Sequence, residues 1–248
     1  EKGYYIDESG TRVEGLIRNE DWESNPISFD FKLSEQSERQ TLSINSVKEF
    51  GITGILKYRK CKVLIDRSSD QVSELNNQRN PVFSEETLFL QLLVEGKANL
   101  YGYNNKGLTR YFFSKDSGAI EQLVYKSYLN SQNQININSL FRQQLLEKLY
   151  CPEVTFNEIK NIDYRKSELI AYFIAYNKSL NVEALLYQEN KNREYLNITI
   201  KPGLQFSSLY IQNDFEYFDH INFEDKTSFR ATIEIESVLP FNNNKQAG

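Results

Sequence analysis

The chain has 248 residues, of which 40% are hydrophobic and 13% aromatic, and its formal net charge is −5 at neutral pH. This length is sufficient for one large domain or two smaller ones with a hydrophobic core. The acidic balance argues against nonspecific nucleic-acid binding, because such binding needs a basic surface that displaces counterions. No apolar run reaches the length of about 18 residues that predicts a transmembrane helix.

The sequence contains no methionine and begins at Glu1. Because a reading frame begins with Met, we expect that a segment precedes this chain. A signal peptide removed on export is the favoured interpretation, and a trimmed chain is the alternative. The two cysteines, Cys61 and Cys151, could form a disulfide in an oxidising periplasm or remain two buried thiols, and the sequence leaves both open.

Strand signals dominate residues 1–130. Short apolar segments at 4–6 and 13–17 flank turn-type residues, which predicts a hairpin. A second hairpin is predicted around Asn104-Asn105-Lys106-Gly107, because Asn and Gly tolerate the positive φ of tight turns. Alternation or apolar runs predict further strands at 29–33, 42–44, 63–65 and 88–94. The polar stretch 66–80 is expected to be a long loop or a frayed helix, and 120–129 a strand or a short helix.

The hydrophobic period changes to a helical one between residues 139 and 180. Phe141, Leu145 and Leu149 share one helical face, Ser139 can cap the start, and Pro152 ends the helix. Thr155 and Glu158 have the spacing of a capping box, and the apolar residues after them predict one or two more helices before residue 180. Residues 181–194 are polar and charged and are interpreted as a linker.

The last fifty residues contain two long segments of period-2 alternation, separated by an acidic stretch at 213–227 that is expected to form a loop. This pattern is typical of an outer-membrane barrel hairpin, and both segments exceed the about 9–11 residues that a spanning strand needs. An ordinary antiparallel sheet with one solvated face is the alternative. The residues expected to face lipid are Leu196, Ile198, Ile200, Leu204, Phe206, Tyr210, Phe229, Ala231, Ile233, Ile235, Leu239 and Phe241. Lys201, Arg230, Glu234 and Glu236 would then face the barrel lumen.

Several stretches resemble the mature start of Bacteroidota outer-membrane proteins, especially flavobacterial ones. They are Gly3-Tyr4-Tyr5-Ile6-Asp7, Val13-Glu14-Gly15-Leu16-Ile17-Arg18-Asn19, Ser46-Val47-Lys48-Glu49-Phe50-Gly51-Ile52, Ile65-Asp66-Arg67-Ser68-Ser69 and Phe141-Arg142-Gln143-Gln144-Leu145. The resemblance covers nearly the whole chain and implies a signal peptide, an N-terminal soluble region and a C-terminal barrel of the PorT-like, OmpA-like or porin type. It implies no catalytic residue. The chain departs from the family by ending just after the second barrel-like strand.

The sequence offers little support for catalysis or for a cofactor. His220 is the only histidine and is expected in a surface loop, although it could report pH. One histidine and two distant cysteines do not supply a zinc cage, and phosphate-binding glycine motifs are absent. Acidic residues near 66–70 and 213–225 do not fit calcium-loop spacing. The aromatic cluster Tyr101, Tyr103, Tyr111, Phe112 and Phe113 could stack a ligand, but the core face of a hairpin explains it better.

The sequence therefore predicts an α+β protein: an antiparallel, hairpin-rich N-terminal domain with a helical segment, followed by the first strands of a transmembrane β-barrel. The expected domains are a soluble one at 1–190, β-rich over 1–130 and helical over 139–180, and a truncated barrel hairpin at 195–248. The first hypothesis is a non-enzymatic protein of the bacterial outer membrane without catalytic residues, metal or cofactor. Its periplasmic domain would serve assembly or interaction with outer-membrane or periplasmic proteins. The alternatives are an exported, soluble binding domain for a glycan or peptide, and an unrecognised hydrolase.

Overall fold

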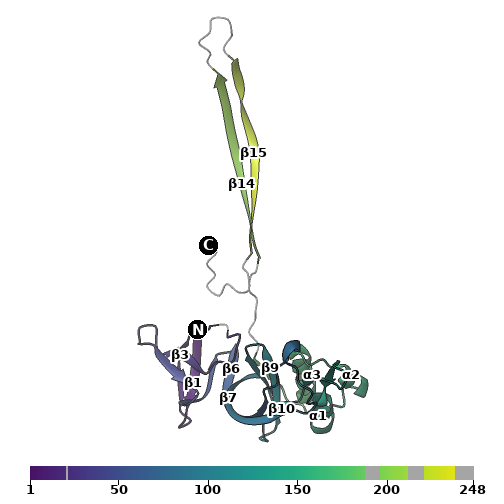
Figure 1. Ribbon diagram of the computed structural model, residues 1–248. Helices are drawn as coiled ribbons and strands as arrows, with labels where there is room; N and C mark the ends of the chain where they lie inside the picture. Colours follow the sequence, from purple (N-terminus) through teal and green to yellow (C-terminus); the bar gives the residue numbers. More distant parts are fainter. Residues whose placement is uncertain (21, 188–195, 212–220, 238–248) are drawn as a thin grey trace. The chain divides into compact units, whose positions relative to one another are not determined.

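The computed structural model describes residues 1–20, 22–187, 196–211 and 221–237. Backbone contacts divide the chain into two compact units, Glu1–Asn190 and Lys191–Gly248. The first unit is mostly β, with one large antiparallel sheet and three short helices among its described residues, and the second contains a two-stranded sheet (Figure 1). The predicted antiparallel sheet and helical segment are thus confirmed.

The first hairpin of the sequence forms as predicted. Strand β1 pairs with β2 in antiparallel register around a turn in which Gly10 has a φ of 90°. Strand β5 returns to the free side of β1, so the chain order and the spatial order of the strands differ. The strands of this part are β1 (Lys2–Asp7), β2 (Arg12–Ile17), β3 (Ser28–Lys32), β4 (Gln40–Ser43) and β5 (Val47–Ile52).

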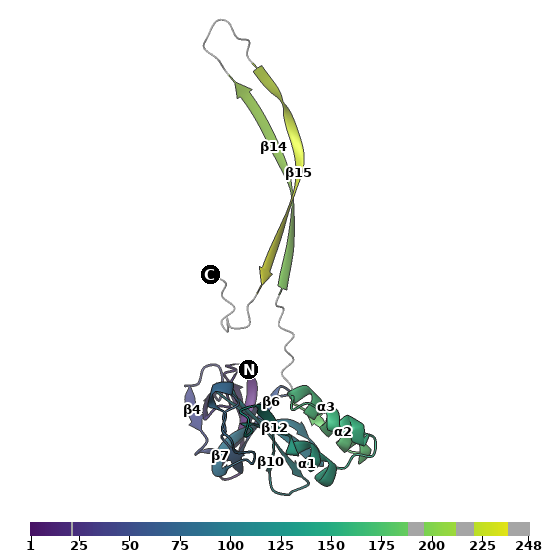
Figure 2. The same ribbon diagram turned by 45° about the vertical axis from the view of Figure 1, so that its right-hand side comes forward.

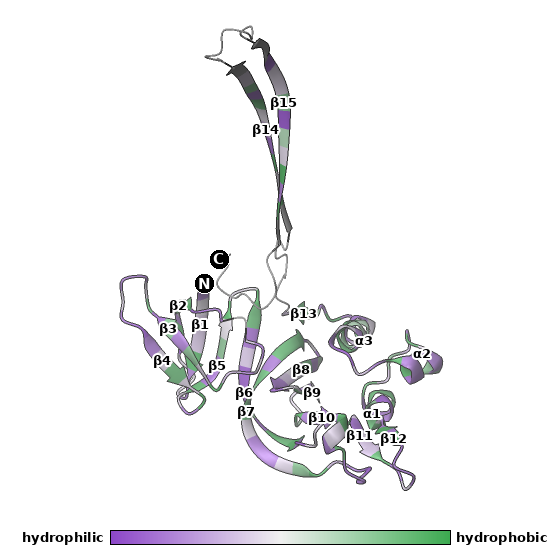
Figure 3. Ribbon diagram, turned by 45° about the horizontal axis from the view of Figure 1, so that its top comes forward, coloured by the Kyte–Doolittle hydropathy of each residue, from purple (hydrophilic) through white to green (hydrophobic). Residues whose placement is uncertain are grey.

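The second part of the large sheet continues from β5 and curls. The long strand β7 bends strongly (Figure 3), and β10 comes close to β6, where the backbone N–H of Asp66 donates to Gln122 Oε1 at 2.9 Å. The predicted tight turn is present at Lys106-Gly107, where both residues have positive φ. The strands are β6 (Leu56–Asp66), β7 (Phe83–Glu95), β8 (Ala98–Asn105), β9 (Leu108–Lys115) and β10 (Glu121–Leu123). The order across the sheet is β10-β9-β8-β7-β6-β5-β1-β2-β3-β4.

Three helices group together beside β8–β10 (Figures 1 and 2). They are α1 (Leu140–Lys148), α2 (Phe156–Asn161) and α3 (Lys166–Ser179). Asn177 on α3 binds strand β8 as a neighbouring strand would, because its side-chain amide accepts from Ala98 N at 3.0 Å and donates to Ala98 O at 2.9 Å. A Cβ at Gly96 would lie 2.4 Å from Asn177 Oδ1, so this docking requires a glycine there.

The core of the first unit consists of three hydrophobic clusters. One lies between the helices and the sheet and includes Phe141, Leu145 and Phe173. A second centres on Phe50, which stacks on Phe29 at 4.0 Å between ring centroids. The third fills the curl of β6–β9 and includes Tyr101, Tyr103 and Phe112 from the β8–β9 hairpin. Both faces of β8 and β9 are therefore buried, which explains their nearly continuous apolar sequences.

The loop alternative predicted for 66–80 is confirmed, and this loop contains the short 3-10 helix η1 (Val72–Glu74). Two other predicted connections differ in detail from the structure. Residues 120–129 form two strands, β10 and β11 (Lys126–Leu129), and β11 pairs with an unpredicted strand, β12 (Ile135–Asn138). The linker predicted at 181–194 begins with a short strand, β13 (Leu185–Leu186), paired with β7, and residues 188–194 lie outside the described residues. Alternation misses such strands because two to four residues carry too little periodic signal.

Candidate functional site

The second unit is a hairpin of β14 (Leu196–Ile211, 16 residues) and β15 (Ile221–Ser237, 17 residues). Strand β15 begins at Ile221, so the loop prediction for 213–227 is wrong for residues 221–227, which belong to this strand. Their polar composition concealed the alternation of the strand. A register shift lies between Ser207 and Leu209, and beyond it Leu209 pairs with Phe223 and Ile211 with Ile221. His220 and the residues 212–219 lie outside the described residues.

The register places the apolar residues of both strands opposite one another. Ile198 pairs with Ile235, Ile200 with Ile233, and Leu204 with Phe229. Directly opposed residues in an antiparallel pair share a face, so one side of the hairpin is apolar from Ile198 to Phe206. The side chains on this side are largely exposed, with fractions from 59% at Ile198 to 75% at Phe206. We call the set Ile198, Ile200, Leu204, Phe206, Phe229, Ala231, Ile233 and Ile235 the apolar face.

The structure thus brings eight of the twelve residues predicted to face lipid onto one side of one hairpin. Leu196 and Tyr210 belong to β14 by their backbones, and Leu239 and Phe241 lie outside the described residues. The opposite side carries Lys201, Arg230 and Glu234, and Lys201 Nζ lies 2.5 Å from Glu234 Oε2. The two sides of the hairpin therefore suit two different environments. No helix in the described part of the chain is long and apolar enough to cross a membrane.

The first unit holds a network of charged side chains that the sequence did not reveal. Glu49 accepts from Tyr4 Oη at 2.8 Å and from Arg59 Nε at 3.0 Å, and Glu95 accepts from Lys57 Nζ at 2.8 Å and from Tyr187 Oη at 2.7 Å. Tyr187 also donates its backbone N–H to Leu93 O at 3.0 Å, so the network fastens the last described residue of this unit to β7.

Burial and ion pairing act against each other in this network. Burial alone would raise the pKa of Glu95, but the hydrogen bonds from Lys57 and Tyr187 lower it below its ordinary value. Burial likewise opposes the charge of Arg59, yet the neighbouring carboxylates of Glu49 and Glu95 raise its pKa. The shifts of Glu95 and Arg59 therefore both favour the charged form, as in a structural network.

The disulfide that the sequence left open is not formed. Cys61 and Cys151 are free and buried, and they lie in different hydrophobic clusters. Burial raises the pKa of the Cys61 thiol to about 12, so it stays protonated and unreactive at neutral pH. Among the residues that the structure describes, no group of three or more His, Cys, Asp or Glu side chains could hold a metal ion.

The predicted aromatic cluster belongs to the core. Tyr101, Tyr103, Tyr111, Phe112 and Phe113 are all at least 93% buried. A different aromatic-lined cavity of about 490 Å³ lies between Glu20, the 22–28 segment and strands β7 and β8. The single tryptophan of the chain lines it, together with Phe89, Tyr103 and Asn105.

Asn25 holds the wall of this cavity in place. Its side-chain amide donates to Phe89 O at 2.8 Å and Gly102 O at 3.1 Å, and it accepts from Asn104 N at 2.9 Å. The Trp22 ring packs edge-on against Phe50 at 5.8 Å between centroids. The cavity is therefore a fixed feature of the first unit.

Comparisons of the chain with protein-family models, with curated proteins and with solved structures find no match. The function is consequently argued from the geometry of the two units.

Proposed function

We propose that this chain is part of a non-enzymatic, exported protein of the bacterial outer membrane. In this proposal the β14–β15 hairpin belongs to the wall of a membrane β-barrel, with its apolar face toward lipid and the opposite side toward the lumen. The first unit lies in the periplasm and serves as an assembly or interaction module for other outer-membrane or periplasmic proteins. The resemblance of its sequence to flavobacterial outer-membrane proteins favours the same location.

The observation that carries the proposal is the in-register, exposed apolar face. It extends from Ile198 to Phe206 on β14, which reaches the about 9–11 residues that a tilted spanning strand needs, and over the shorter stretch from Phe229 to Ile235 on β15. Barrel strands alternate in this way because one side meets hydrocarbon while the other meets water or the barrel interior. Pro202 stands opposite Ala231 and has no backbone N–H, so a barrel wall would lack one ladder hydrogen bond at this position.

The stability of the hairpin supports the same conclusion. A two-stranded sheet is at best marginally stable in water. Seven large apolar side chains of this hairpin are more than half exposed, and soluble monomers rarely expose contiguous apolar patches of more than a few hundred Å². Burial of this face is the main free-energy gain available to the hairpin, and hydrocarbon supplies it along the whole length of the strands.

The first unit offers exposed edges for an interaction module. Strands β4 and β12 lie at the ends of their sheets, and an end strand presents backbone groups that a partner strand can pair with. On β12, Ile135 and Ile137 share one side and are 49% and 54% exposed. A partner with an extended apolar segment would pair with the backbone of β12 and cover Ile135 and Ile137.

Single cysteines on adjacent residues of β14 test the membrane assignment. In protein made from its complete reading frame in a Gram-negative host, a fluorophore on Ile200→Cys should be quenched by nitroxide-labelled lipid. The matched control is Thr199→Cys, one residue away on the opposite side, where quenching should come from aqueous iodide. Ile233→Cys and Thr232→Cys repeat the comparison on β15. Water-exposed labels at all four positions, without lipid quenching, would refute the proposal; the native thiols are buried and should not react.

The second candidate function is binding of a glycan or peptide by the first unit. The cavity lined by Trp22 favours it, because aromatic rings and nearby hydroxyl and amide groups suit a sugar or an apolar side chain. Titration of soluble oligosaccharides and peptides against the fluorescence of the single tryptophan tests it. A saturable change that Tyr103→Ala abolishes would favour this function, and unchanged emission with every ligand would count against it.

A further inference from the structure

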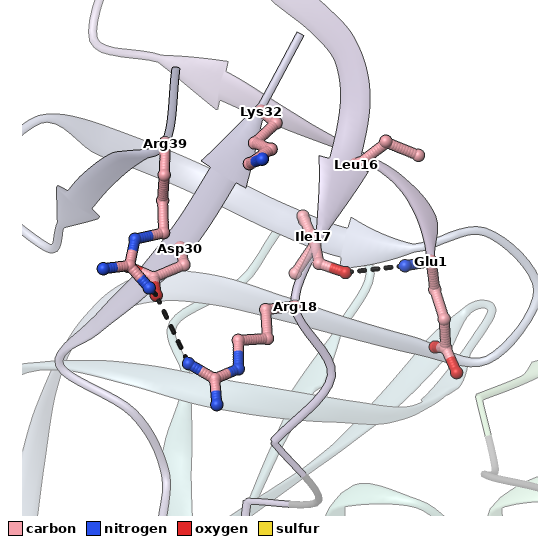
Figure 4. A pocket seen from close by; sticks show the side chains of 7 residues that line it. All are labelled: Glu1, Leu16, Ile17, Arg18, Asp30, Lys32 and Arg39. Carbon is pink, nitrogen blue, oxygen red and sulfur yellow. Dashed lines mark hydrogen bonds and ion pairs between the residues drawn. The ribbon is translucent and has the colours of Figure 1, made fainter. Parts of the chain in front are cut away.

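We propose that a second, cationic pocket of the first unit binds a phosphate group. The pocket has a volume of about 390 Å³ and lies where strands β2, β3 and β4 meet (Figure 4). Arg18, Lys32 and Arg39 line it together with the acidic residues Glu1 and Asp30, in a chain whose net charge is −5. The proposal does not depend on where the hairpin of the second unit lies.

The sheet register explains why these side chains meet. Lys32 pairs with Leu16, and Asp30 pairs with Thr41. Residues two apart on a strand share a face, so Arg18 falls beside Leu16, and Arg39 falls on the same side as Thr41. The opposite side of these strands carries Ile17, Phe29 and Phe31, which are buried in the core. The pocket is therefore on the outer face of the sheet.

Asp30 holds the two arginines toward each other. Its Oδ2 atom lies 3.4 Å from Arg39 Nη1 and 4.0 Å from Arg18 Nη1, while its Oδ1 atom accepts from Thr41 Oγ1 at 2.8 Å. The Asp30 side chain is 18% exposed, whereas those of Arg18 and Arg39 are 63% and 60% exposed. One half-buried carboxylate thus positions two guanidinium groups and leaves most of their N–H donors open to solvent.

The remaining charges leave these donors available. The Glu20 carboxylate lies 3.5 Å from Arg18 Nε and Asp30 faces Arg18 Nη1, which leaves Arg18 Nη2 for a ligand. Glu1 accepts from Asn19 Nδ2 at 3.1 Å, and its carboxylate lies apart from the arginine pair in Figure 4. Lys32 has no ion-pair partner among the residues that the structure describes.

This arrangement suits phosphate better than a carboxylate. Guanidinium forks bind tetrahedral oxyanions through paired, charge-assisted hydrogen bonds, and a lysine adds a point charge. Two arginines and one lysine on different strands can reach several oxygens of one phosphate dianion, whereas a carboxylate has only two oxygens to offer. The phosphate could be a free ion or the headgroup of an anionic lipid, since both present the same chemistry.

Binding of inorganic phosphate and of lipid vesicles tests this inference. We expect the unmodified chain to bind inorganic phosphate by calorimetry, or phosphatidylglycerol vesicles by sedimentation, at constant ionic strength. Arg18→Gln and Arg39→Gln should each weaken binding about tenfold or more. Arg165→Gln is the matched control, since that arginine is 74% exposed beside Asp163 at the start of α3 and does not line this pocket, and it should bind as the unmodified chain does.

The outcomes distinguish a free phosphate from a lipid headgroup, and either from the absence of a phosphate site. Loss of inorganic phosphate binding in the two pocket variants alone would assign a free phosphate, and loss of vesicle binding alone would assign a lipid headgroup. Equal binding by all variants, binding to neither probe, or acetate bound as tightly as phosphate would each overturn the proposal. Because both arginines are exposed, unchanged circular dichroism is expected and shows that a loss of binding is not a loss of fold.

Discussion

At the scale of single residues, the first unit depends on buried polar side chains that bind the backbone. Arg110 is fully buried and donates to Asp66 O at 3.1 Å, Ser68 O at 2.5 Å and Asp70 Oδ2 at 2.6 Å. It therefore closes the start of the long 66–82 loop over the curl of the sheet. A buried arginine is stable only when its donors are satisfied. Detaching this loop from the sheet would therefore cost a large amount of free energy.

Removal of Arg110 should accordingly be severe. Arg110→Leu is expected to lower the free energy of unfolding by about 3–5 kcal/mol, because it leaves the buried carboxylate of Asp66 and several carbonyl groups without their partner. Urea denaturation followed by the fluorescence of the single tryptophan measures the change. Arg165→Leu, at an exposed position, should change stability by less than about 0.5 kcal/mol. Equal effects of the two substitutions would show that Arg110 is not an anchor.

Glu95 should make stability depend on pH. Burial opposes its charge, but Lys57 and Tyr187 lower its folded-state pKa below the ordinary value of 4.5. A carboxylate with a lowered folded-state pKa stabilises the protein fully above its unfolded-state pKa, and this contribution is lost as pH falls through the folded-state value.

Glu95→Gln should therefore flatten the decline in stability below about pH 4.5. Urea midpoints measured at intervals through the acid range would show the difference. Glu85→Gln is the control, because Glu85 forms an exposed ion pair with Lys62, and such pairs contribute little. A decline as steep in Glu95→Gln as in the unmodified chain would contradict the role of Glu95.

At the scale of elements, the helix boundaries show which sequence signals are reliable. Thr155 and Glu158 form the predicted capping box, with the Thr155 Oγ1 atom accepting from Glu158 N at 3.3 Å. Ser139 stands at the predicted start of α1, but its side chain makes no capping hydrogen bond. Composition identifies a residue that can cap, whereas the local φ and ψ angles decide whether its side chain reaches the helix N–H groups.

The two helix starts provide a matched pair of substitutions. Thr155→Ala should destabilise the first unit by about 1 kcal/mol, because it removes a side chain that satisfies a helix N–H group. Ser139→Ala should have a clearly smaller effect, since no capping bond is lost. Thermal unfolding of both variants measures the difference. A larger loss for Ser139→Ala would show that the capping geometry at α1 differs in solution.

At the scale of the whole molecule, the backbone contacts form two separate units, and their stabilities should be independent. Leu145→Ala, in the core beneath the helices, should lower the stability of the first unit by about 2–5 kcal/mol. Ile200→Thr, on the exposed apolar face, should leave that stability unchanged within about 0.5 kcal/mol.

The emission of Trp22, which packs on Phe50, reports the unfolding of the first unit alone. A large effect of Ile200→Thr on this signal would show that the two units fold together. The same substitution should weaken membrane association if the apolar face meets lipid, so one variant separates the two roles of the chain.

The sequence alone determined the features that depend on neighbours along the chain. The 104–107 turn, the capping box at Thr155 and the alternation of the last two strands are local patterns, and each produces the expected element. Local patterns also placed Ile198, Ile200, Ile233 and Ile235 on one side, because the period of a strand is fixed.

Only the tertiary structure decided the features that join distant residues. The pairing of β5 with β1, the curl that brings β10 to β6, and the burial of Arg110 each depend on contacts between segments that no periodicity relates. The same holds for the convergence of Arg18, Lys32 and Arg39, since three ordinary surface cations become a pocket only through the register of three strands. Burial and pairing between distant segments stabilise these features, whereas the sequence pattern reflects only the interactions within one element.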